Sequence, residues 1–426
     1  MFFKIPKQKN RKALSAGIIF IVSGIMLNQW ILAYFFSDGQ IETFLKKALI
    51  WIIDIALIAS GILIIIRNKP VSVKQILQIG VLFFISFVIT EICFRLIYPA
   101  VSPVNQQFEK SEYFVPKPYV MFGGKPNHIE LNRLGYKEDA PAIQRNPNEV
   151  RIFLLGGSAL FEGDTTISRL LENEFHAHGF RCINCFNWGM PASTSGLELA
   201  KIVFEIADSE PDIIVMYNGG NDFMTPLWAD PRPGYPYNFF IYESNPLLIK
   251  DISSYPMLSL AFYGSKILRF LFPSYFINTF TRFEKIKKEV NYGQESWKNA
   301  IVTAYLNNVI KASKTSKAFG ADFMLFFQPL VYFKDKLSKE EQAFQSKTGL
   351  RKYITCLHEK FNYKIDSVNK QYKLNYADLS NIFDTCNLQT FADDIHTLPK
   401  SKHIIAVTMY KQMIQKIDSA RFSGAK

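Results

Sequence analysis

Cysteine is scarce in this chain, with five in 426 residues. Cys93 lies in an apolar stretch, and the other four are Cys182, Cys185, Cys356 and Cys386. Cys182 and Cys185 have the spacing of half a metal site, but no second pair has ligand spacing, so no metal centre is predicted. The four later cysteines are an even number, and they can form two disulfides, in three possible pairings, or remain buried thiols.

Repeats and low-complexity tracts are also missing, and acidic residues are nearly absent from the first 98 residues. That segment contains 11 Lys and Arg but only 4 Asp and Glu, so it carries +7 of the formal net charge of +12. The remaining +5 is spread over the rest of the 426 residues. This distribution argues against a nucleic-acid-binding protein, because the later residues form only a mildly basic surface.

Three long apolar stretches occupy most of the N-terminal segment, at residues 13–36, 48–66 and 75–98. Each has about the length that a helix needs to cross the hydrocarbon core of a bilayer. Helices of a soluble core are seldom apolar on every face, so three transmembrane helices are predicted within a membrane domain of residues 1–98. A cleaved signal peptide is the main alternative for the first stretch, but the run is too long and no convincing cleavage site follows it.

The basic residues around these stretches predict an orientation. Five Lys and Arg precede the first stretch and three lie between the second and third, whereas the first loop has two, together with two acidic residues. The N-terminus is therefore expected in the cytoplasm, and everything after Tyr98 outside it, in a multi-pass protein of the inner or plasma membrane. Asp54, Glu91 and Arg95 lie within the stretches, and an ion pair between the last two would fix helix packing.

The later residues divide into a lead-in and an α/β domain. Residues 99–148 contain seven prolines, which argue against long helices, and residues 130–137 have the pattern of a short strand and turn. Over residues 149–420, apolar runs alternate with helical spacing, which predicts a parallel sheet with helices on both faces. Strands are expected at residues 150–155, 181–187, 212–217 and 322–327, and helices at residues 167–178, 195–209, 297–319 and 401–416.

An insertion at residues 223–295 interrupts this alternation. It is rich in aromatic residues and prolines. A loop of this length is uncommon unless it has a function or a fold of its own. Two interpretations stay open: an extra helical subdomain with an aromatic core, or the wall of a substrate cleft, a lid or a membrane-facing surface.

Polar residues that could form a catalytic site follow the first three expected strands and recur near the C-terminus. Ser158 follows two glycines after the first strand, Gly189 follows the second, and Asn221 follows the third. Asp393 and His396 lie three residues apart, before the last helix. The carboxyl ends of parallel strands meet at one edge of the sheet, where open α/β proteins build their sites.

These residue types fit acyl transfer through a serine ester. A serine hydroxyl becomes a good nucleophile when a base removes its proton, so Ser158 and His396 would be nucleophile and base, with Asp393 orienting the imidazole. The oxyanion needs preorganised donors, and the candidates are the N–H groups of Ser158 and Gly189 and the side-chain amide of Asn221. Taken singly, these residues also fit a helix N-cap and ordinary turns.

The choice of base is between two histidines. His403 lies on the helix expected at residues 401–416, whereas His396 precedes that helix. A loop residue reaches the sheet edge more readily than one on a helix, and a carboxylate three residues away can hold the ring. His396 is therefore preferred over His403.

In this order, the fragments resemble the SGNH hydrolase superfamily, also called GDSL-like esterases. The blocks are Gly156-Gly157-Ser158, Gly189, Gly219-Gly220-Asn221-Asp222 and Asp393-Asp394-Ile395-His396. The resemblance implies a flavodoxin-like three-layer α/β/α domain, with Ser158 as nucleophile, Gly189 and Asn221 as oxyanion donors, and Asp393 and His396 completing the triad. It covers residues 149–420 except the insertion at 223–295. Gly157 stands where the family's name motif has Asp, which weakens the match to the secreted lipase branch.

Together with the apolar N-terminus, the resemblance leads to a membrane-anchored extracytoplasmic serine esterase or O-acyltransferase. The expected substrates are O-acyl groups, acetyl in particular, of cell-surface glycans, without a cofactor. A transferase would need a membrane partner that donates the acyl group, because three helices are too few to carry it across. An interfacial lipid esterase or lysophospholipase is the alternative enzyme, and a non-catalytic glycan-binding membrane protein is the alternative of another class.

Overall fold

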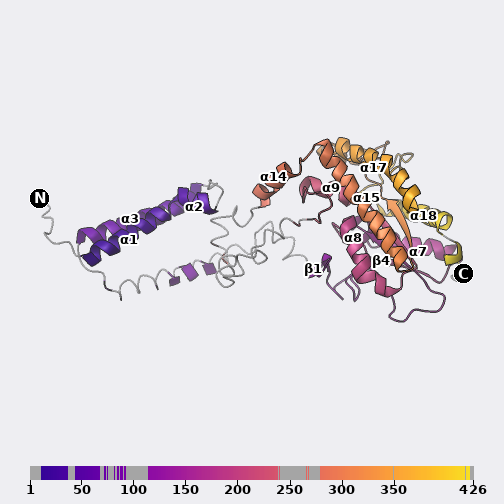
Figure 1. The fold of residues 1–426 in the computed structure, drawn as a ribbon, viewed down its shortest axis with the longest axis horizontal. Helices are drawn as coiled ribbons and strands as arrows, with labels where there is room; N and C mark the ends of the chain where they lie inside the picture. Colours follow the sequence, from indigo (N-terminus) through magenta and orange to yellow (C-terminus); the bar gives the residue numbers. More distant parts are fainter. Residues whose placement is uncertain are drawn as a thin grey trace. The chain divides into compact units, whose positions relative to one another are not determined.

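The computed structural model describes residues 11–36, 44–67, 114–237 and 279–422, except residues 349 and 418, and a few isolated residues between 72 and 92 and between 239 and 267. The chain forms two compact units. The first comprises residues 1–110 and 241–282, and the second comprises residues 111–240 and 283–426. Figure 1 shows the elements of each unit.

In the first unit, helices α1 (Arg11–Met26), α2 (Gln29–Phe36) and α3 (Phe44–Arg67) carry the first two apolar stretches. Helices α1 and α3 lie side by side, and they touch where each has a glycine (Figure 1). A Cβ atom added to Gly61 would lie 2.6 Å from the carbonyl oxygen of Gly17. Any larger residue at either position would therefore push the two helices apart.

The first apolar stretch was expected to form one helix, but the structure shows two, because the helix is broken at Asn28. The Asn28 side-chain oxygen accepts hydrogen bonds from the N–H groups of Trp30, at 2.9 Å, and Ile31, at 3.0 Å. This is the bonding of an N-cap, so a second helix starts at residue 29. Because apolar residues lie on both sides of Asn28, the sequence pattern does not indicate this break in the helix.

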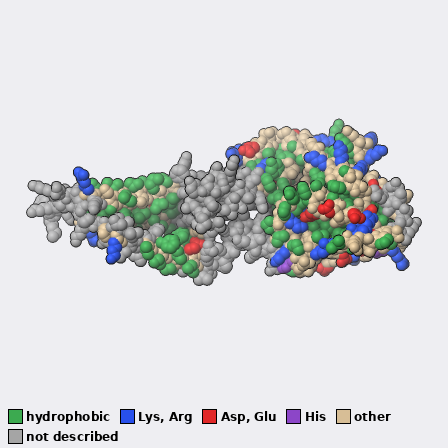
Figure 2. Space-filling model, turned by 60° about the horizontal axis from the view of Figure 1, so that its bottom comes forward, with side chains coloured by type: hydrophobic (Ala, Val, Ile, Leu, Met, Phe, Trp, Pro, Cys, Tyr) green, Lys and Arg blue, Asp and Glu red, His purple; other side chains and the backbone are tan. Residues whose placement is uncertain are grey.

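Among the residues that the structure describes, one helix is long and apolar enough to cross a membrane, Lys47–Arg67, with a mean hydropathy of 2.8. Residues Ala13–Met26 form a shorter apolar helix. Hydrophobic side chains make up much of the described surface at the left of Figure 2, and Ile19, Ile52 and Ile55 are each more than 60% exposed. The third expected span, residues 75–98, lies mostly outside the described residues, so the structure supports one candidate span.

The second unit is built on a five-stranded parallel sheet in the order β4-β3-β5-β6-β7. Its strands are β3 (Val150–Gly156), β4 (Ile183–Asn187), β5 (Ile213–Asn218), β6 (Asp322–Phe327) and β7 (Tyr376–Asp378). Successive side chains of a strand point to opposite faces, and Phe153, Leu154 and Leu155 are all completely buried. Both faces of the sheet are therefore covered, as the expected α/β architecture requires.

The covering helices form two groups. Helix α7 (Ile167–Ala177) packs against α18 (Pro399–Lys416), where the rings of Phe175 and Tyr410 are 5.0 Å apart. Helix α15 (Glu295–Ala318) packs against α8 (Ser195–Lys201), α9 (Gly220–Trp228) and α17 (Arg351–Tyr372). The remaining described helices include α6 (Ser158–Phe161), α14 (Thr279–Glu289), α16 (Lys339–Thr348) and a 3₁₀ turn at Ser419–Phe422.

The helix expected over residues 195–209 changes character along its length. After α8 come a π-helical turn, Ile202–Ile206, and a short 3₁₀ turn, Ala207–Ser209. The wider turn places Glu205 so that it accepts hydrogen bonds from the Tyr136 hydroxyl and from Lys117 Nζ, the latter at 3.1 Å. These contacts tie the lead-in to the helical layer.

The described part of the lead-in contains a hairpin that was not expected, β1 (Phe114–Lys117) with β2 (Met121–Gly124). The short strand and turn expected at residues 130–137 is a single bridge between Leu131 and Lys137. Of the aromatic insertion expected at residues 223–295, helices α9 and α14 and the residues up to 237 are described. Most of residues 238–278 lie outside the described part, so neither interpretation of that segment is tested.

Candidate active site

Three of the expected site residues form a continuous hydrogen-bonded chain. The Asp393 carboxylate accepts from Nδ1 of His396 at 2.6 Å, and Nε2 of the same ring lies 2.7 Å from the Ser158 hydroxyl oxygen. When the Nδ1–H group donates a hydrogen bond to the carboxylate, Nε2 carries no proton and accepts a hydrogen bond from the serine hydroxyl. The chain brings together residues that lie 238 positions apart in the sequence.

The strand β3 positions Ser158, which is the first residue of α6. Gly157 is the N-cap of this four-residue helix, and the Ser158 side chain makes no capping bond. The capping explanation for Ser158 therefore does not hold. Its hydroxyl points instead to the imidazole, at the carboxyl edge of the sheet.

Asp393 folds the turn that carries His396. Its second carboxylate oxygen accepts the backbone N–H groups of Ile395, at 2.9 Å, and His396, at 2.8 Å. The His396 carbonyl in turn accepts the N–H of Ala392 at 2.7 Å, and a bridge joins Phe391 to Thr397. The three-residue spacing thus serves both the turn and the side-chain contact.

The contact favours a negative carboxylate and a positive imidazole. Burial raises the pKa of Asp393, but the hydrogen bonds from the His396 ring and from two backbone N–H groups outweigh burial, and the net shift is downward. Burial lowers the pKa of His396, but the hydrogen bond and charge of Asp393, with the charge of Glu162, outweigh it, and the net shift is upward. The carboxylates around His396 therefore stabilise its protonated form, the imidazolium.

Asn221, the second residue of α9, lies against the turn before Ser158. A Cβ atom added to Gly157 would lie 2.4 Å from the Asn221 amide nitrogen. That nitrogen donates one hydrogen to the Ser193 carbonyl at 2.8 Å, which leaves its second hydrogen available. The structure thus explains Gly157 here, because any side chain would collide with this amide.

Asp222 anchors the helix that carries Asn221. Its carboxylate accepts the Ser195 hydroxyl at 2.5 Å and the Ser195 N–H at 3.1 Å, and Asn308 donates to the same hydroxyl at 3.1 Å. Burial raises the pKa of Asp222 to about 6, against the opposing effect of the Ser195 bonds. The start of α9 is in this way fixed to α8 and α15.

The backbone N–H of Gly189, an expected oxyanion donor, is already bonded. It donates to the Asn187 side-chain oxygen at 2.8 Å. Asn187 is completely buried at the end of β4, and its side-chain oxygen finds its hydrogen-bond donor in the turn that follows the strand. The structure therefore does not offer the Gly189 N–H to a substrate.

Ala192, three residues later, offers a candidate backbone donor in place of Gly189. Its φ of 59° is in the left-handed region, and the next residue, Ser193, accepts the Asn221 amide. Within the described part of the chain, the Ala192 N–H donates to no partner. No sequence signal could have singled it out, because alanine rarely adopts this conformation.

His403 lies apart from this site. Its ring is 58% exposed on α18, and its nearest carboxylate is Glu174, at 3.9 Å. Cys182, Cys185, Cys356 and Cys386 are free thiols, so the structure shows no disulfide among these four, and the expected burial holds for Cys185 while the other three are partly exposed. No group of three His, Cys, Asp or Glu side chains within the described residues could hold a metal ion.

No protein-family model and no curated protein matches the sequence. Solved structures do match, among them one titled TesA, with 14% identity over 63% of this chain and 99% of that chain, and a TM-score of 0.34. A lipase/acylhydrolase from Enterococcus faecalis matches with 13% identity over 63% and 97%, and a TM-score of 0.37. A mutant acetyl-xylooligosaccharide esterase from Geobacillus matches with 10% identity over 62% and 94%, and a TM-score of 0.37. Likenesses this distant carry no argument about activity, so function rests on the site.

Proposed function

We propose that this chain is an SGNH-type serine hydrolase that acts on esters through an acyl-enzyme on Ser158. The observation that carries the proposal is the chain of hydrogen bonds from Asp393 through His396 to Ser158, with the Asn221 amide beside the nucleophile. A nucleophile, a base, an orienting carboxylate and an oxyanion donor are then present together.

The reaction has two steps. In the first, His396 Nε2 removes the hydroxyl proton as Ser158 Oγ attacks the ester carbonyl carbon. The Asn221 amide and the N–H groups of Ser158 and Ala192 are the proposed donors to the oxyanion. The carbon–oxygen bond to the alcohol then breaks, and the alcohol takes the proton from the imidazolium. In the second step, water or another hydroxyl attacks the acyl-enzyme by the same route in reverse.

The proposed substrates are O-acyl groups, acetyl in particular, of cell-surface glycans. The candidate span Lys47–Arg67 and the exposed apolar helices beside it support a membrane anchor. We infer a three-span, multi-pass anchor with a cytoplasmic N-terminus from the three apolar stretches and the distribution of basic residues. A membrane partner would supply the acyl group if the enzyme transfers it.

Ester chain length is the test of this substrate class. The full chain, in detergent micelles, would be assayed with acetyl esters and with long-chain esters of the same alcohol. Higher kcat/KM for acetyl esters supports the proposal. Higher kcat/KM for long-chain esters would instead support an interfacial lipid esterase.

Replacing Asn221 by alanine is expected to lower kcat by about a hundredfold to a thousandfold, because one oxyanion donor is lost. KM should change little, since the amide acts mainly on the charge of the intermediate. The measurement is steady-state kinetics on an acetyl ester. The matched control is Asn184→Ala, whose amide bonds Glu149 at 2.8 Å at the opposite end of the sheet. Equal losses of kcat in the two variants would show that Asn221 does not act as an oxyanion donor.

The pH dependence of kcat/KM should follow the neutral form of His396. The raised pKa of His396 places the acid limb above pH 6.5, the ordinary value for histidine, and activity falls as pH is lowered through it. Asp393→Asn should move the limb to lower pH, because the negative partner that stabilises the imidazolium is lost. A wild-type limb below pH 6.5, or an unmoved limb in the variant, would contradict this assignment.

A further inference from the structure

A second carboxylate lies at the edge of the imidazole where the proton is transferred. Glu162 Oε1 is 3.3 Å from His396 Nε2, the nitrogen that also contacts the Ser158 hydroxyl. Glu162 is the C-cap of α6, and its backbone N–H donates to the Ser158 carbonyl at 2.8 Å, so it follows the nucleophile by one helical turn. Half of the Glu162 side chain is exposed, which places it on the solvent side of the catalytic residues.

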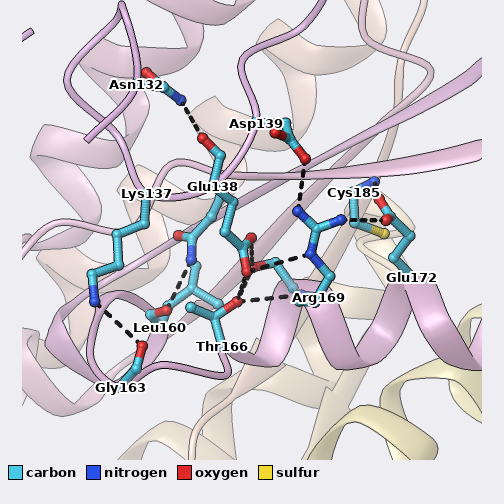
Figure 3. A network of polar contacts seen from close by, with 12 residues as sticks. Asn132, Lys137, Glu138, Asp139, Leu160, Gly163, Thr166, Arg169, Glu172 and Cys185 are labelled. Carbon is cyan, nitrogen blue, oxygen red and sulfur yellow. Dashed lines mark hydrogen bonds and ion pairs between the residues drawn. The ribbon is translucent and has the colours of Figure 1, made fainter. Parts of the chain in front are cut away.

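The backbone around Glu162 is fixed by two buried ammonium groups. Lys402 Nζ, from α18, donates to the Glu162 carbonyl, and the Lys402 residue is 6% exposed. Lys137 Nζ donates to the Gly163 carbonyl at 3.3 Å (Figure 3). Gly163 has a φ of 92°, and a Cβ atom there would lie 2.6 Å from Lys402 Nζ. Position 163 therefore needs glycine, and the two lysine contacts hold the backbone of Glu162 in place.

The segment after Gly163 is tied down as well. Glu138 accepts hydrogen bonds from Thr166, the N-cap of α7, and from Ser168 at 2.7 Å. Arg169 joins Glu172, at 2.8 Å, and Asp139, at 2.7 Å (Figure 3). A carboxylate on a loop anchored at both ends is preorganised, so it can bind a substrate group without ordering the loop first.

The chemistry of the site specifies what Glu162 can bind. In the proposed reaction, the alcohol oxygen of the ester must approach His396 Nε2 to take its proton. The next polar group of the alcohol then meets Glu162. An ionised carboxylate only accepts hydrogen bonds, so that group must be a donor. A hydroxyl fits, whereas a phosphate or carboxylate would be repelled.

We propose that Glu162 forms a subsite for a hydroxyl that neighbours the ester oxygen on the alcohol part of the substrate. The enzyme then selects monoacylated polyols, such as sugars, over esters of simple alcohols. This inference rests on the proposed function, because it needs Ser158 and His396 to act on the same ester.

The experiment compares two substrates in the full-length protein in detergent. One is a pyranoside with a single acetyl group next to a free hydroxyl, and the other is its deoxy analogue without that hydroxyl. The wild type is expected to prefer the first by about tenfold to a hundredfold in kcat/KM, as for a hydrogen bond to a charged group. Glu162→Ala should remove the preference, and Glu162→Gln should leave a weaker one, since an amide oxygen accepts less strongly.

Asp164→Asn is the matched control, because it neutralises a carboxylate two residues along the same loop. It is expected to keep the full preference. Equal losses on both substrates in Glu162→Ala and Glu162→Gln would overturn the inference, because Glu162 would then act only on the imidazole. Fluorophosphonate labelling separates the two proposals. If Ser158 is labelled but the Glu162 variants keep the wild-type preference for the hydroxyl-bearing substrate, the subsite alone is refuted. If the wild type is not labelled, the proposed function is refuted and the subsite with it.

Discussion

Replacing Ser158 by alanine is expected to abolish covalent labelling by a fluorophosphonate and to lower ester turnover by about four to six orders of magnitude. The hydroxyl oxygen is the atom that forms the acyl bond, and no other described hydroxyl lies against His396 Nε2. Residual turnover would come from the oxyanion donors and substrate binding alone. The measurement is gel-based labelling together with acetyl ester kinetics, on the full chain in detergent.

The fold should survive this change. The Ser158 side chain contacts His396 and makes no capping bond, so we expect the free energy of unfolding to change by less than about 1 kcal/mol. Ser209→Ala is the matched control, since Ser209 ends the 3₁₀ turn before β5, at the amino edge of the sheet. It should label and react like the wild type. Labelling that persists in Ser158→Ala would place the nucleophile elsewhere.

The strands that carry the site could be predicted from the sequence for a physical reason. A parallel strand buried on both faces is a continuous apolar run, and the strands expected at residues 150–155 and 212–217 match β3 (Val150–Gly156) and β5 (Ile213–Asn218) to within one residue at each end. The last strand, Tyr376–Asp378, could not be predicted, because three residues are too few to show a pattern. The hairpin at Phe114–Gly124 was missed because Pro116 argues against a strand.

The hydrogen-bonded chain of Asp393, His396 and Ser158 could be predicted because its parts follow from local rules. Asp393 and His396 are close in sequence, and Ser158 lies at a strand end where such sites form. The proposed oxyanion donors were harder to predict, because they depend on backbone geometry. Gly189 was the expected donor, but its N–H is bonded to the Asn187 side chain, whereas Ala192 has a left-handed φ of 59° that its residue type does not indicate.

Glu162 shows a different limit of sequence reasoning. A glutamate after a short helix is ordinarily a solvated surface residue, and nothing in its neighbours indicates otherwise. Its placement depends on Lys402, which lies 240 residues later on α18. A contact over this distance cannot be inferred from one sequence. The same holds for Gly163, since its φ of 92° and the 2.6 Å between a Cβ atom there and Lys402 Nζ cannot be inferred from the sequence around it.

The second large effect is expected at His396. Replacing His396 by alanine should lower kcat/KM by about four to six orders of magnitude, because Ser158 then has no base. Asp393→Asn should cost about four orders of magnitude, since the ring loses its orientation and its negative partner. His403→Ala is the matched control, and it should change kcat/KM by less than about twofold, because its ring is exposed and apart from Ser158.

The residual activity of His396→Ala would also test the role of Glu162. Glu162 is the nearest remaining carboxylate on the solvent side of the vacated imidazole, and a carboxylate is a far weaker base than imidazole at neutral pH. If it takes over as a weak base, residual turnover should no longer show the acid limb that His396 produces in the wild type. A larger loss in His403→Ala than in His396→Ala would instead show that the base had been assigned to the wrong histidine. The chain of bonds from Asp393 would then be a structural feature of the turn, and the mechanism would have to be rebuilt from α18.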